Sequence, residues 1–431
     1  METLAEGLKV VFFGILMFSL IVVVHEAGHF TAARLFGLRV KEFMLGLPGP
    51  NVGFTFKGTK FGVTPILLGG YALIAGEGGG KPNSHLASAF SYLASHGSLT
   101  EEEVREAEGA LGYDLEEALD VLDAWGTVKR LKQKGRSVYA MPAADGAAEG
   151  APRPVADPEA HIAAEHRLTF GAAPWYQRIV ILVAGAAFNL VFAVIVITAV
   201  QMAVGTQVPT TTIETVVEGS PAAAAGLGSG DAIVSLDGVA VDSWEGFTVL
   251  MGERAPGQEA TLVVRPAGSE GTRELTVVFA EGEGRALLGV TTHLEQAPVF
   301  LLDALGTSVG YIGMVAGAIV QLFNPATFSD VVSQSASVVG VSFIARDAAE
   351  AGFLPFIYIA AALSISIGLM NLLPLPPLDG GKIVVETIER ITRRSIPVRA
   401  VNTVSVMALA LLVMLFVFVT GQDVQRYIIG G

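Results

Sequence analysis

Five long apolar stretches without a charged side chain divide the chain into polar and non-polar parts. They cover residues 10–24, 179–204, 304–329, 351–378 and 400–422. A helix that crosses a bilayer needs about 20 residues, so four of the stretches are long enough alone. The first reaches that length if its helix continues through His25 to Ala33. This pattern predicts an α-helical membrane protein that crosses the bilayer several times.

The composition indicates the same class. The chain has 431 residues, of which 52% are hydrophobic and 16% charged, whereas soluble proteins carry about 25% charged residues. The first apolar stretch leads into His25 and Glu26 and not into a small-residue cleavage site, so we do not expect a cleaved signal peptide. Without cysteine there is no disulfide and no thiolate nucleophile. The net charge of −14 argues against nucleic acid as a main partner.

Basic residues indicate which polar segments face the cytoplasm. Residues 31–60 carry five basic residues and one acidic residue, and residues 374–399 carry five basic residues. Residues 205–300 carry four basic and thirteen acidic residues. Because short loops rich in Lys and Arg stay cytoplasmic, we place 31–178 and 374–399 inside and 205–300 outside.

The stretch 304–329 does not fit this topology as a spanning helix. If it crossed the membrane, the next helix would carry the basic segment 374–399 to the outside. The stretch is also rich in Gly, Ala and Ser. We therefore expect an interfacial or partly inserted hairpin there, four spans in all, and both termini outside.

The first apolar stretch ends in the motif HEAGH, which contains His25, Glu26 and His29. On a helix, positions i and i+4 share one face, so both imidazoles can bind one metal ion. Glu26 lies beside them and can take a proton from a metal-bound water. Two His and a Glu in a spanning helix are costly in lipid and indicate a functional site. The alternative is a polar trio that is satisfied inside a helix bundle.

A hydrolytic zinc site has three protein ligands and one open position, and no third ligand directly follows His29. The candidate is Asp379, which follows NLLPLPPL at residues 371–378 and precedes two glycines. The prolines end the helix before the carboxylate, and the glycines permit a tight turn. Asp379 would then lie at the cytoplasmic end of its span, at the depth of His25 and His29. The alternative role for Asp379 is a helix cap or a turn residue.

The HEAGH helix, the segment NLLPLPPLDGG and a domain between them resemble the site-2 protease family of intramembrane zinc proteases, above all the bacterial branch that trims anti-sigma factors. The resemblance covers about residues 1–80 and 166–431. Further matching segments are Gly69-Gly70-Tyr71 with Glu77, and Gly185-Ala186-Ala187-Phe188-Asn189. Residues 340–344 read GVSFI where the family usually has Gly-Pro and an aliphatic residue, which puts a local turn in doubt but not the chemistry.

The resemblance implies a mechanism. Zn²⁺ held by His25, His29 and Asp379 would lower the pKa of its bound water and polarise the scissile carbonyl. Glu26 would accept the proton of this water and return it to the leaving amine.

The resemblance also implies substrate contacts. Asn371, Gly69 and Gly70 would bind an unwound substrate, and a β-hairpin within residues 54–75 would dip into the membrane and offer a strand edge. Asn371 has the alternative of bonding the end of its own helix, and the hairpin could be an ordinary cytoplasmic one. Asn189 is interpreted as a helix-packing contact and not as a catalytic group.

The outer polar block resembles a PDZ domain of the kind found in bacterial proteases. A turn at Gly230-Asp231 would start a strand, and Asp237-Gly238 would close a hairpin. Such a domain either adds a peptide as a strand or obstructs access to the active site.

The cytoplasmic block contains an insert outside the common family core, at residues 98–141. Two expected helices, at 100–108 and 113–123, and a basic hairpin around Lys134-Gly135 resemble a winged-helix module. The basic side chains could meet nucleic acid, protein or anionic lipid, or they could form a solvated structural wing. Residues 143–158, rich in Ala, Pro and Gly, read as a linker.

These observations predict an α-helical polytopic membrane protein with four transmembrane helices, a membrane-associated β-hairpin, an extracytoplasmic PDZ domain and a small cytoplasmic α+β insert. The expected divisions are 1–80 (first span and hairpin), 81–166 (insert and linker), 167–204 (second span), 205–296 (PDZ domain), 297–350 (interfacial segment) and 351–431 (third and fourth spans).

The expected function is an intramembrane zinc metalloendopeptidase of the bacterial inner membrane. Its substrates would be spanning segments of membrane proteins, such as anti-sigma factors or signal-peptide remnants. One alternative is a non-catalytic scaffold with a peptide-binding PDZ domain and a structural metal, but such a site does not need Glu26. Another is a metal transporter, but the second and fourth spans contain no ionisable residue.

Overall fold

The computed structural model describes residues 2–67, 69–78, 82–133, 136–144, 146–282, 285–394 and 396–425. The chain forms two compact units, which are described separately. The first unit comprises residues 1–197 and 305–431, and the second comprises residues 198–304.

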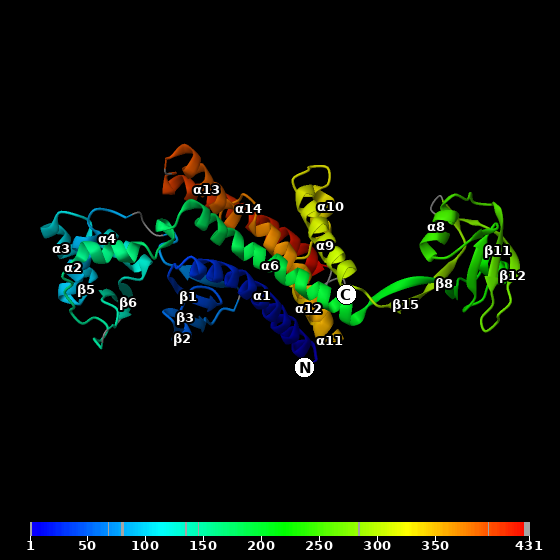
Figure 1. Cartoon of the computed structure of the whole chain (residues 1–431), viewed down its shortest axis with the longest axis horizontal. Helices are drawn as coiled ribbons and strands as arrows, with labels where there is room; N and C mark the ends of the chain where they lie inside the picture. Colours follow the sequence, from blue (N-terminus) through cyan, green and yellow to red (C-terminus); the bar gives the residue numbers. More distant parts are fainter. Residues whose placement is uncertain are drawn as a thin grey trace. The chain divides into compact units, whose positions relative to one another are not determined.

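Five helices in the described residues are long and apolar enough to cross a membrane (Figure 1). They are α1 (Glu2–Leu35), α6 (Trp175–Val204), α9 (Leu301–Gln321), α12 (Phe353–Asn371) and α14 (Val398–Val424). This confirms the predicted class of polytopic helical protein. At 304–329 the structure has one long helix, α9, and then the short helix α10 (Phe328–Gln334), where we expected a hairpin.

In the first unit, α1 and α12 run in the same direction and α6 runs against them. Phe13, in the first half of α1, and Phe356, near the start of α12, have ring centroids 6.1 Å apart. Near the end of α1, His25 contacts Asp379, which follows α12 and begins α13 (Asp379–Thr392). Ile181, in the second turn of α6, contacts the last histidine of α1. The ends of α1 and α12 and the start of α6 therefore meet.

The segment 340–344, which departs from the family pattern, lies inside the helix α11 (Val338–Ala351). A Cβ on Gly340 would lie 2.4 Å from Asp423 Oδ2, so only glycine fits. Asp423 is buried near the end of α14 and accepts a hydrogen bond of 2.6 Å from the Ser337 N–H. This carboxylate caps the first turn of α11 and ties the end of α14 to it.

A four-stranded sheet follows α1, in the order β2-β3-β1-β4. The strands are β1 (Val40–Leu45), β2 (Val52–Phe56), β3 (Thr59–Val63) and β4 (Gly70–Ile74). The expected β-hairpin is the pair β2–β3, but it belongs to a larger sheet, because β1 pairs parallel with β3 and antiparallel with β4. Val52, Phe54 and Phe56 are exposed along β2, and β4 forms the other edge.

The insert folds around its own core, which includes Phe90, Leu119, Trp125 and Tyr139. Its elements are α2 (Leu86–His96), β5 (Ser98–Thr100), α3 (Glu101–Leu111), α4 (Leu115–Trp125), β6 (Lys129–Gln133), β7 (Arg136–Ala140) and α5 (Pro158–His166). The strand order is β5-β7-β6. The two expected helices and the hairpin strands are present, whereas the hairpin tip at Lys134-Gly135 lies outside the described residues.

The C-terminal end of α4 docks on the sheet through its free carbonyls. Arg39 Nη1 donates to the Trp125 carbonyl at 3.3 Å, and the Gly76 N–H donates to the Ala124 carbonyl at 3.0 Å. Arg39 also forms an ion pair of 2.5 Å with Glu165 on α5. Lys41 Nζ bonds the Asp123 carbonyl. Cations at the negative end of a helix dipole are favourable, so these contacts fix the insert to the strand that follows α1.

The second unit is a strand-rich fold with two short helices. Its strands are β8 (Thr206–Val216), β9 (Ala232–Leu236), β10 (Val239–Ala240), β11 (Glu259–Arg265), β12 (Arg273–Val278), β13 (Ala280–Gly282), β14 (Arg285–Leu287) and β15 (Val290–Ala297). The main sheet has the order β12-β11-β9-β8-β15, and the helices are α7 (Pro221–Ala224) and α8 (Trp244–Gly252). Asp237 and Gly238 take positive φ angles of 49° and 80° and join β9 to β10, as expected for a two-residue hairpin turn.

Candidate metal centre

The helix α1 brings His25 and His29 to one face, four residues apart. Both side chains are buried, and their ring centroids lie 4.8 Å apart. Their Nε2 atoms are separated by 3.2 Å. This is the geometry that the HEAGH spacing predicts for a helix.

Asp379 reaches the histidines because the chain turns sharply after α12. A Cβ on Gly380 would lie 2.2 Å from the Leu373 carbonyl oxygen, and a Cβ on Gly381 would lie 2.3 Å from the Pro376 nitrogen. The two glycines therefore allow the start of α13 to pack onto the proline-rich segment. The buried carboxylate of Asp379 begins α13, with Oδ2 at 3.1 Å from each histidine Nε2.

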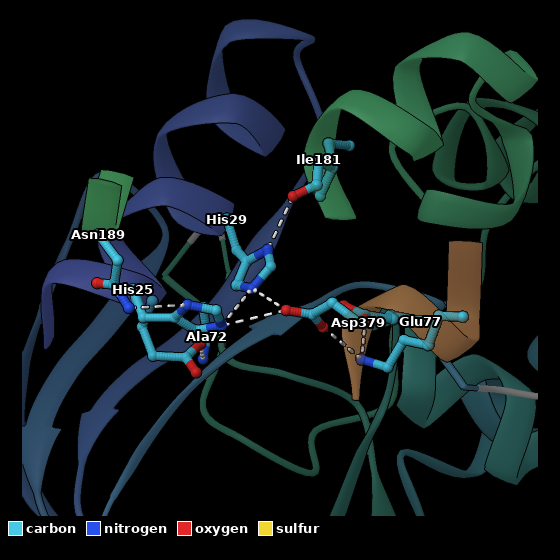
Figure 2. A network of polar contacts seen from close by, with 9 residues as sticks. His25, His29, Ala72, Glu77, Ile181, Asn189 and Asp379 are labelled. Carbon is cyan, nitrogen blue, oxygen red and sulfur yellow. Dashed lines mark hydrogen bonds and ion pairs between the residues drawn. The ribbon is translucent and has the colours of Figure 1, made fainter. Parts of the chain in front are cut away.

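The three ligand atoms fit a zinc ion. They all lie within 4.8 Å of one another, and Figure 2 shows them pointing toward a common centre. Ligands at the usual Zn–N and Zn–O distances of a tetrahedral ion are about 3.3–3.5 Å apart, close to the observed separations. His29 Nδ1 donates to the Ile181 carbonyl at 2.8 Å, so the neutral ring presents a lone pair at Nε2. Two imidazoles and one carboxylate are the donor set of a hydrolytic zinc site.

Lys382 and Glu77 form a charged pair beside Oδ1, the second carboxylate oxygen of Asp379. Lys382 Nζ lies 3.7 Å from Asp379 Oδ1 and 2.8 Å from Glu77 Oε1. Burial lowers the pKa of Lys382, but Glu77 and Asp379 more than offset this effect and raise it above its ordinary value. Lys382 therefore stays charged and links the carboxylate of Asp379 to Glu77, which follows β4.

Two glycines allow α1 and α6 to cross closely at the site. A Cβ on Gly28 would lie 2.2 Å from the Ala184 carbonyl oxygen. A Cβ on Gly185 would lie 2.4 Å from His29 Nε2 and 2.7 Å from His25 Cε1. Position 185 thus has to be empty for both rings to take their places.

Glu26 is adjacent to the first ligand and faces the sheet. Its Oε2 accepts a hydrogen bond of 2.8 Å from the Ala72 N–H of β4. A Cβ on Gly70 would lie 3.8 Å from Glu26 Cγ and 2.9 Å from the Met44 carbonyl oxygen, so the β4 edge runs beside this side chain. The main chain of β4 orients the carboxylate next to the metal ligands.

Two of the expected substrate-binding residues, Gly69 and Gly70, lie at the start of this edge, whereas Asn371 lies at the end of α12 and is not among the residues that line the adjoining cavity. Gly69 has a φ of +109° and precedes Gly70, the first residue of β4. Asn371 is the last residue of α12, and its side chain makes no hydrogen bond within the described part of the chain. A cavity of about 500 Å³ adjoins the site and is lined by β4 (Tyr71, Ala72, Leu73), by Pro376 and Pro377, and by Lys382 of α13.

Several contacts of the site were not predicted from the sequence. The Ile181 carbonyl and the Ala72 N–H are main-chain atoms, which no residue type reveals. Lys382 was read only as part of a basic cytoplasmic segment, and Glu77 only as part of a matching motif. The LDGGK spacing places Lys382 one helical turn after Asp379, and this is the signal that could have identified it.

The chain is similar to several known proteins. Residues 13–415 match the family described as peptidase family M50. The chain is 27% identical to the zinc metalloprotease RasP of Oceanobacillus iheyensis, over 96% of this chain and 98% of the relative. It is 26% identical to the probable protease eep of Enterococcus faecalis, over 97% of this chain and 100% of the relative. A solved PDZ domain of an SdrC-like protein from Listeria monocytogenes covers 21% of this chain and 93% of its own, at 21% identity and a TM-score of 0.18.

Proposed function

The chain belongs to peptidase family M50 and is a zinc metalloprotease, and we propose that it cuts spanning segments of membrane proteins with His25, His29 and Asp379 as the zinc ligands and Glu26 as the general base. One observation supports these residue assignments. The ligand atoms of His25 and His29, on the long helix α1, and of Asp379, at the start of α13, all lie within 4.8 Å of one another.

The proposed chemistry divides between the ion and the chain. Zinc supplies a Lewis acid and makes a nucleophile available at neutral pH. Glu26 takes a proton from the attacking water and gives it to the leaving amine. The Ala72 N–H holds the Glu26 carboxylate at 2.8 Å, so the base keeps one orientation while it exchanges protons.

The substrate is proposed to lie along β4. This strand is at the edge of its sheet and lines the cavity beside Asp379. Apart from the Ala72 N–H, which binds Glu26, such an edge offers N–H and C=O groups to an extended peptide. This suits a substrate helix that must unwind before its carbonyl is accessible. Asn371, Gly69 and Gly70 are proposed to contact the unwound segment. Anti-sigma factors and signal-peptide remnants are the proposed classes of substrate.

Four of the five long helices are proposed to span the bacterial plasma membrane, with both termini outside and the metal centre toward the cytoplasm. The parallel course of α1 and α12 supports this topology, because both must then cross from outside to inside. An even number of crossings must separate α6 from α12, and α9 is the one further helix of span length between them in the described residues. We therefore propose that α9 lies at the outer interface.

Two accessory roles complete the proposal. The second unit is proposed to be a PDZ domain that excludes substrates with large outer domains, with peptide recruitment as the competing role. The insert is proposed to be a docked winged-helix-like module. Arg130 of its basic hairpin pairs with Glu101, Glu116 and Asp120 at 3.0–3.5 Å within the insert itself, which favours a structural hairpin over a nucleic-acid surface.

The test separates catalysis from metal binding. Glu26→Gln should retain one zinc per chain and lose at least about a thousandfold in cleavage of a membrane-inserted substrate, since it removes only the proton acceptor. Glu6→Gln, in the same helix near its exposed end, is the matched control and should cleave like the parent. Parental cleavage by Glu26→Gln would overturn the proposed base. One zinc per chain in Asp379→Ala would overturn the proposed ligand set.

A further inference from the structure

Asn189 is a buried polar residue of α6 with an unusual pairing. The residue is 0% exposed, and its Nδ2 lies 3.5 Å from His25 Nδ1. Its Oδ1 is buried and has no hydrogen-bond partner among the described residues. Figure 2 shows Asn189 on the side of the His25 ring that faces away from Asp379. An amide oxygen left unpaired in a helix bundle is costly, so this placement calls for a functional reason.

The two metal-binding rings need the same kind of support. A neutral imidazole that ligates through Nε2 carries its proton on Nδ1, and this N–H needs an acceptor. His29 has one in the Ile181 carbonyl at 2.8 Å. For His25, the side chain at Nδ1 is the Asn189 amide. If Asn189 Nδ2 faces the ring, its N–H group and the N–H of His25 Nδ1 are two donors that face each other. A half-turn of the amide places Asn189 Oδ1, an acceptor, at this position instead.

We propose that Asn189 is a positioning residue whose amide oxygen accepts the N–H of His25 Nδ1 and so holds the Nε2 lone pair toward His29 and Asp379. The inference rests on the proposed ligand set. It also assigns the orientation of the Asn189 amide, because the oxygen and nitrogen of an amide have nearly the same shape and are distinguished by their hydrogen-bond partners.

The register of α6 against α1 supports this assignment. Ile181, Gly185 and Asn189 are four residues apart and form one stripe along α6. Because α6 runs against α1, the stripe meets the ligands in reverse order. Ile181 contacts His29, Gly185 lies under both rings, and Asn189 contacts His25. The i, i+4 spacing of the ligands is thus matched by an i, i+4, i+8 spacing of their supports.

The helix α12 prevents Asn189 from moving away. Ser364 Oγ donates to the main-chain carbonyl of Asn189 at 3.2 Å. A Cβ on Gly368 would lie 3.1 Å from Asn189 Cβ, so the two backbones are in close contact. The main chain and Cβ of Asn189 are therefore fixed before a metal binds, which limits the positions that its amide can take beside the ring.

The experiment measures zinc affinity of the detergent-solubilised full chain by chelator competition, in the parent, Asn189→Leu, Asn189→Asp and the control Asn402→Leu. Loss of an outer-sphere partner typically weakens metal binding about 10–100-fold, and we expect this range for Asn189→Leu. Asn189→Asp keeps an acceptor and should stay within about tenfold of the parent. Asn402 is exposed on α14, so its replacement should leave zinc affinity unchanged.

Thermal unfolding with and without zinc distinguishes positioning from folding. Without zinc, the His25 ring can carry its proton on Nε2, toward Asp379, and then needs no acceptor at Nδ1. Asn189→Leu should therefore unfold close to the parental temperature without zinc, and zinc should raise that temperature less than in the parent. Three results would each overturn the inference. The first is parental zinc affinity in Asn189→Leu, and the second is an equal loss of zinc affinity in Asn189→Leu and Asn189→Asp. The third is a lower zinc-free stability of Asn189→Leu with unchanged zinc affinity. If Asn189→Leu binds zinc normally but His25→Ala does not, only this inference is overturned. If both variants bind zinc normally, the proposed ligand set is overturned as well.

Discussion

At the scale of single residues, the metal centre depends as much on missing side chains as on ligands. Gly185 contributes no chemistry, yet it decides whether the two imidazoles can lie 3.2 Å apart at Nε2. Main-chain contacts from Ile181 and Ala72 then fix one ligand ring and the base. The site is therefore held by groups that a list of catalytic residue types would omit.

Gly185→Ala tests this view. The new methyl group would overlap both rings, at 2.4 Å from His29 Nε2, so we expect zinc affinity to fall at least about tenfold. Gly7→Ala in α1 is the control, because a Cβ there meets nothing within 4 Å, and replacing a helical glycine by alanine is otherwise stabilising. Unchanged zinc affinity in Gly185→Ala would show that the helices can separate freely at this crossing.

At the scale of elements, the C-terminal end of α4 attaches the insert to the four-stranded sheet. Arg39→Ala removes the ion pair with Glu165 and the bond to the Trp125 carbonyl, in a partly buried setting. We expect α4 amides to exchange faster by an amount that corresponds to about 1–3 kcal/mol. Arg136→Ala is the control, because its pair with Glu102 is exposed at 69% and 70% of the two side chains, and exposed pairs contribute little.

The same ion pair predicts a pH dependence. Burial raises the pKa of Glu165, but Arg39 and Thr127 more than offset this effect and lower it below its ordinary value. A carboxyl with a lowered folded-state pKa stabilises the folded state above its ordinary pKa, and this contribution is lost as pH falls through the lowered value. The protection factors of the α4 amides, which compare the observed exchange with the intrinsic rate at the same pH, should therefore fall on acidification in the parent, and Arg39→Ala should show little of this fall. A parallel fall of the protection factors in both proteins would contradict the role of the pair.

Element prediction succeeded where one physical signal dominated. The long helices follow directly from uncharged apolar length, and the helices of the insert from their acidic first turns. β1 was missed because VKEFML mixes charged and apolar residues just after a helix. α2, β5 and α5 were missed because their positions depend on a core formed between them. In the site, the sequence predicted three residues that the structure brings together, His25, His29 and Asp379. Their contacts on α6 depend on a helix crossing that sequence spacing does not specify.

At the scale of the whole molecule, helix direction limits the topology. His25 and Asp379 are in contact, so the ends of α1 and α12 must lie on one side of the bilayer. A count of helices long enough to span gives five, but contact between the ligands is compatible only with an even number of crossings between α6 and α12. Direction is therefore a stronger constraint here than length.

Single-cysteine labelling tests this topology, and the chain contains no cysteine of its own. Cysteines at Ser269 and Asp330 should react with an impermeant reagent on intact cells. Those at Ser91 and Thr392 should react only after the membrane is opened. All four positions are exposed, so access depends on the side of the membrane. Labelling of position 392 on intact cells would place the end of α13 outside and would contradict the proposed orientation.

The distance along the chain between the ligands has a consequence during synthesis. The histidines are made early, whereas Asp379 follows about 350 residues later, after the second unit and α12. At about 5–20 residues per second this interval lasts roughly 20–70 s, and during it the nascent chain carries two ligands and no complete metal centre. With Asp379 as the proposed third ligand, the nascent peptidase would stay inert beside the newly inserted helices of its neighbours until α13 is made, and a chain truncated before α13 would be harmless to them.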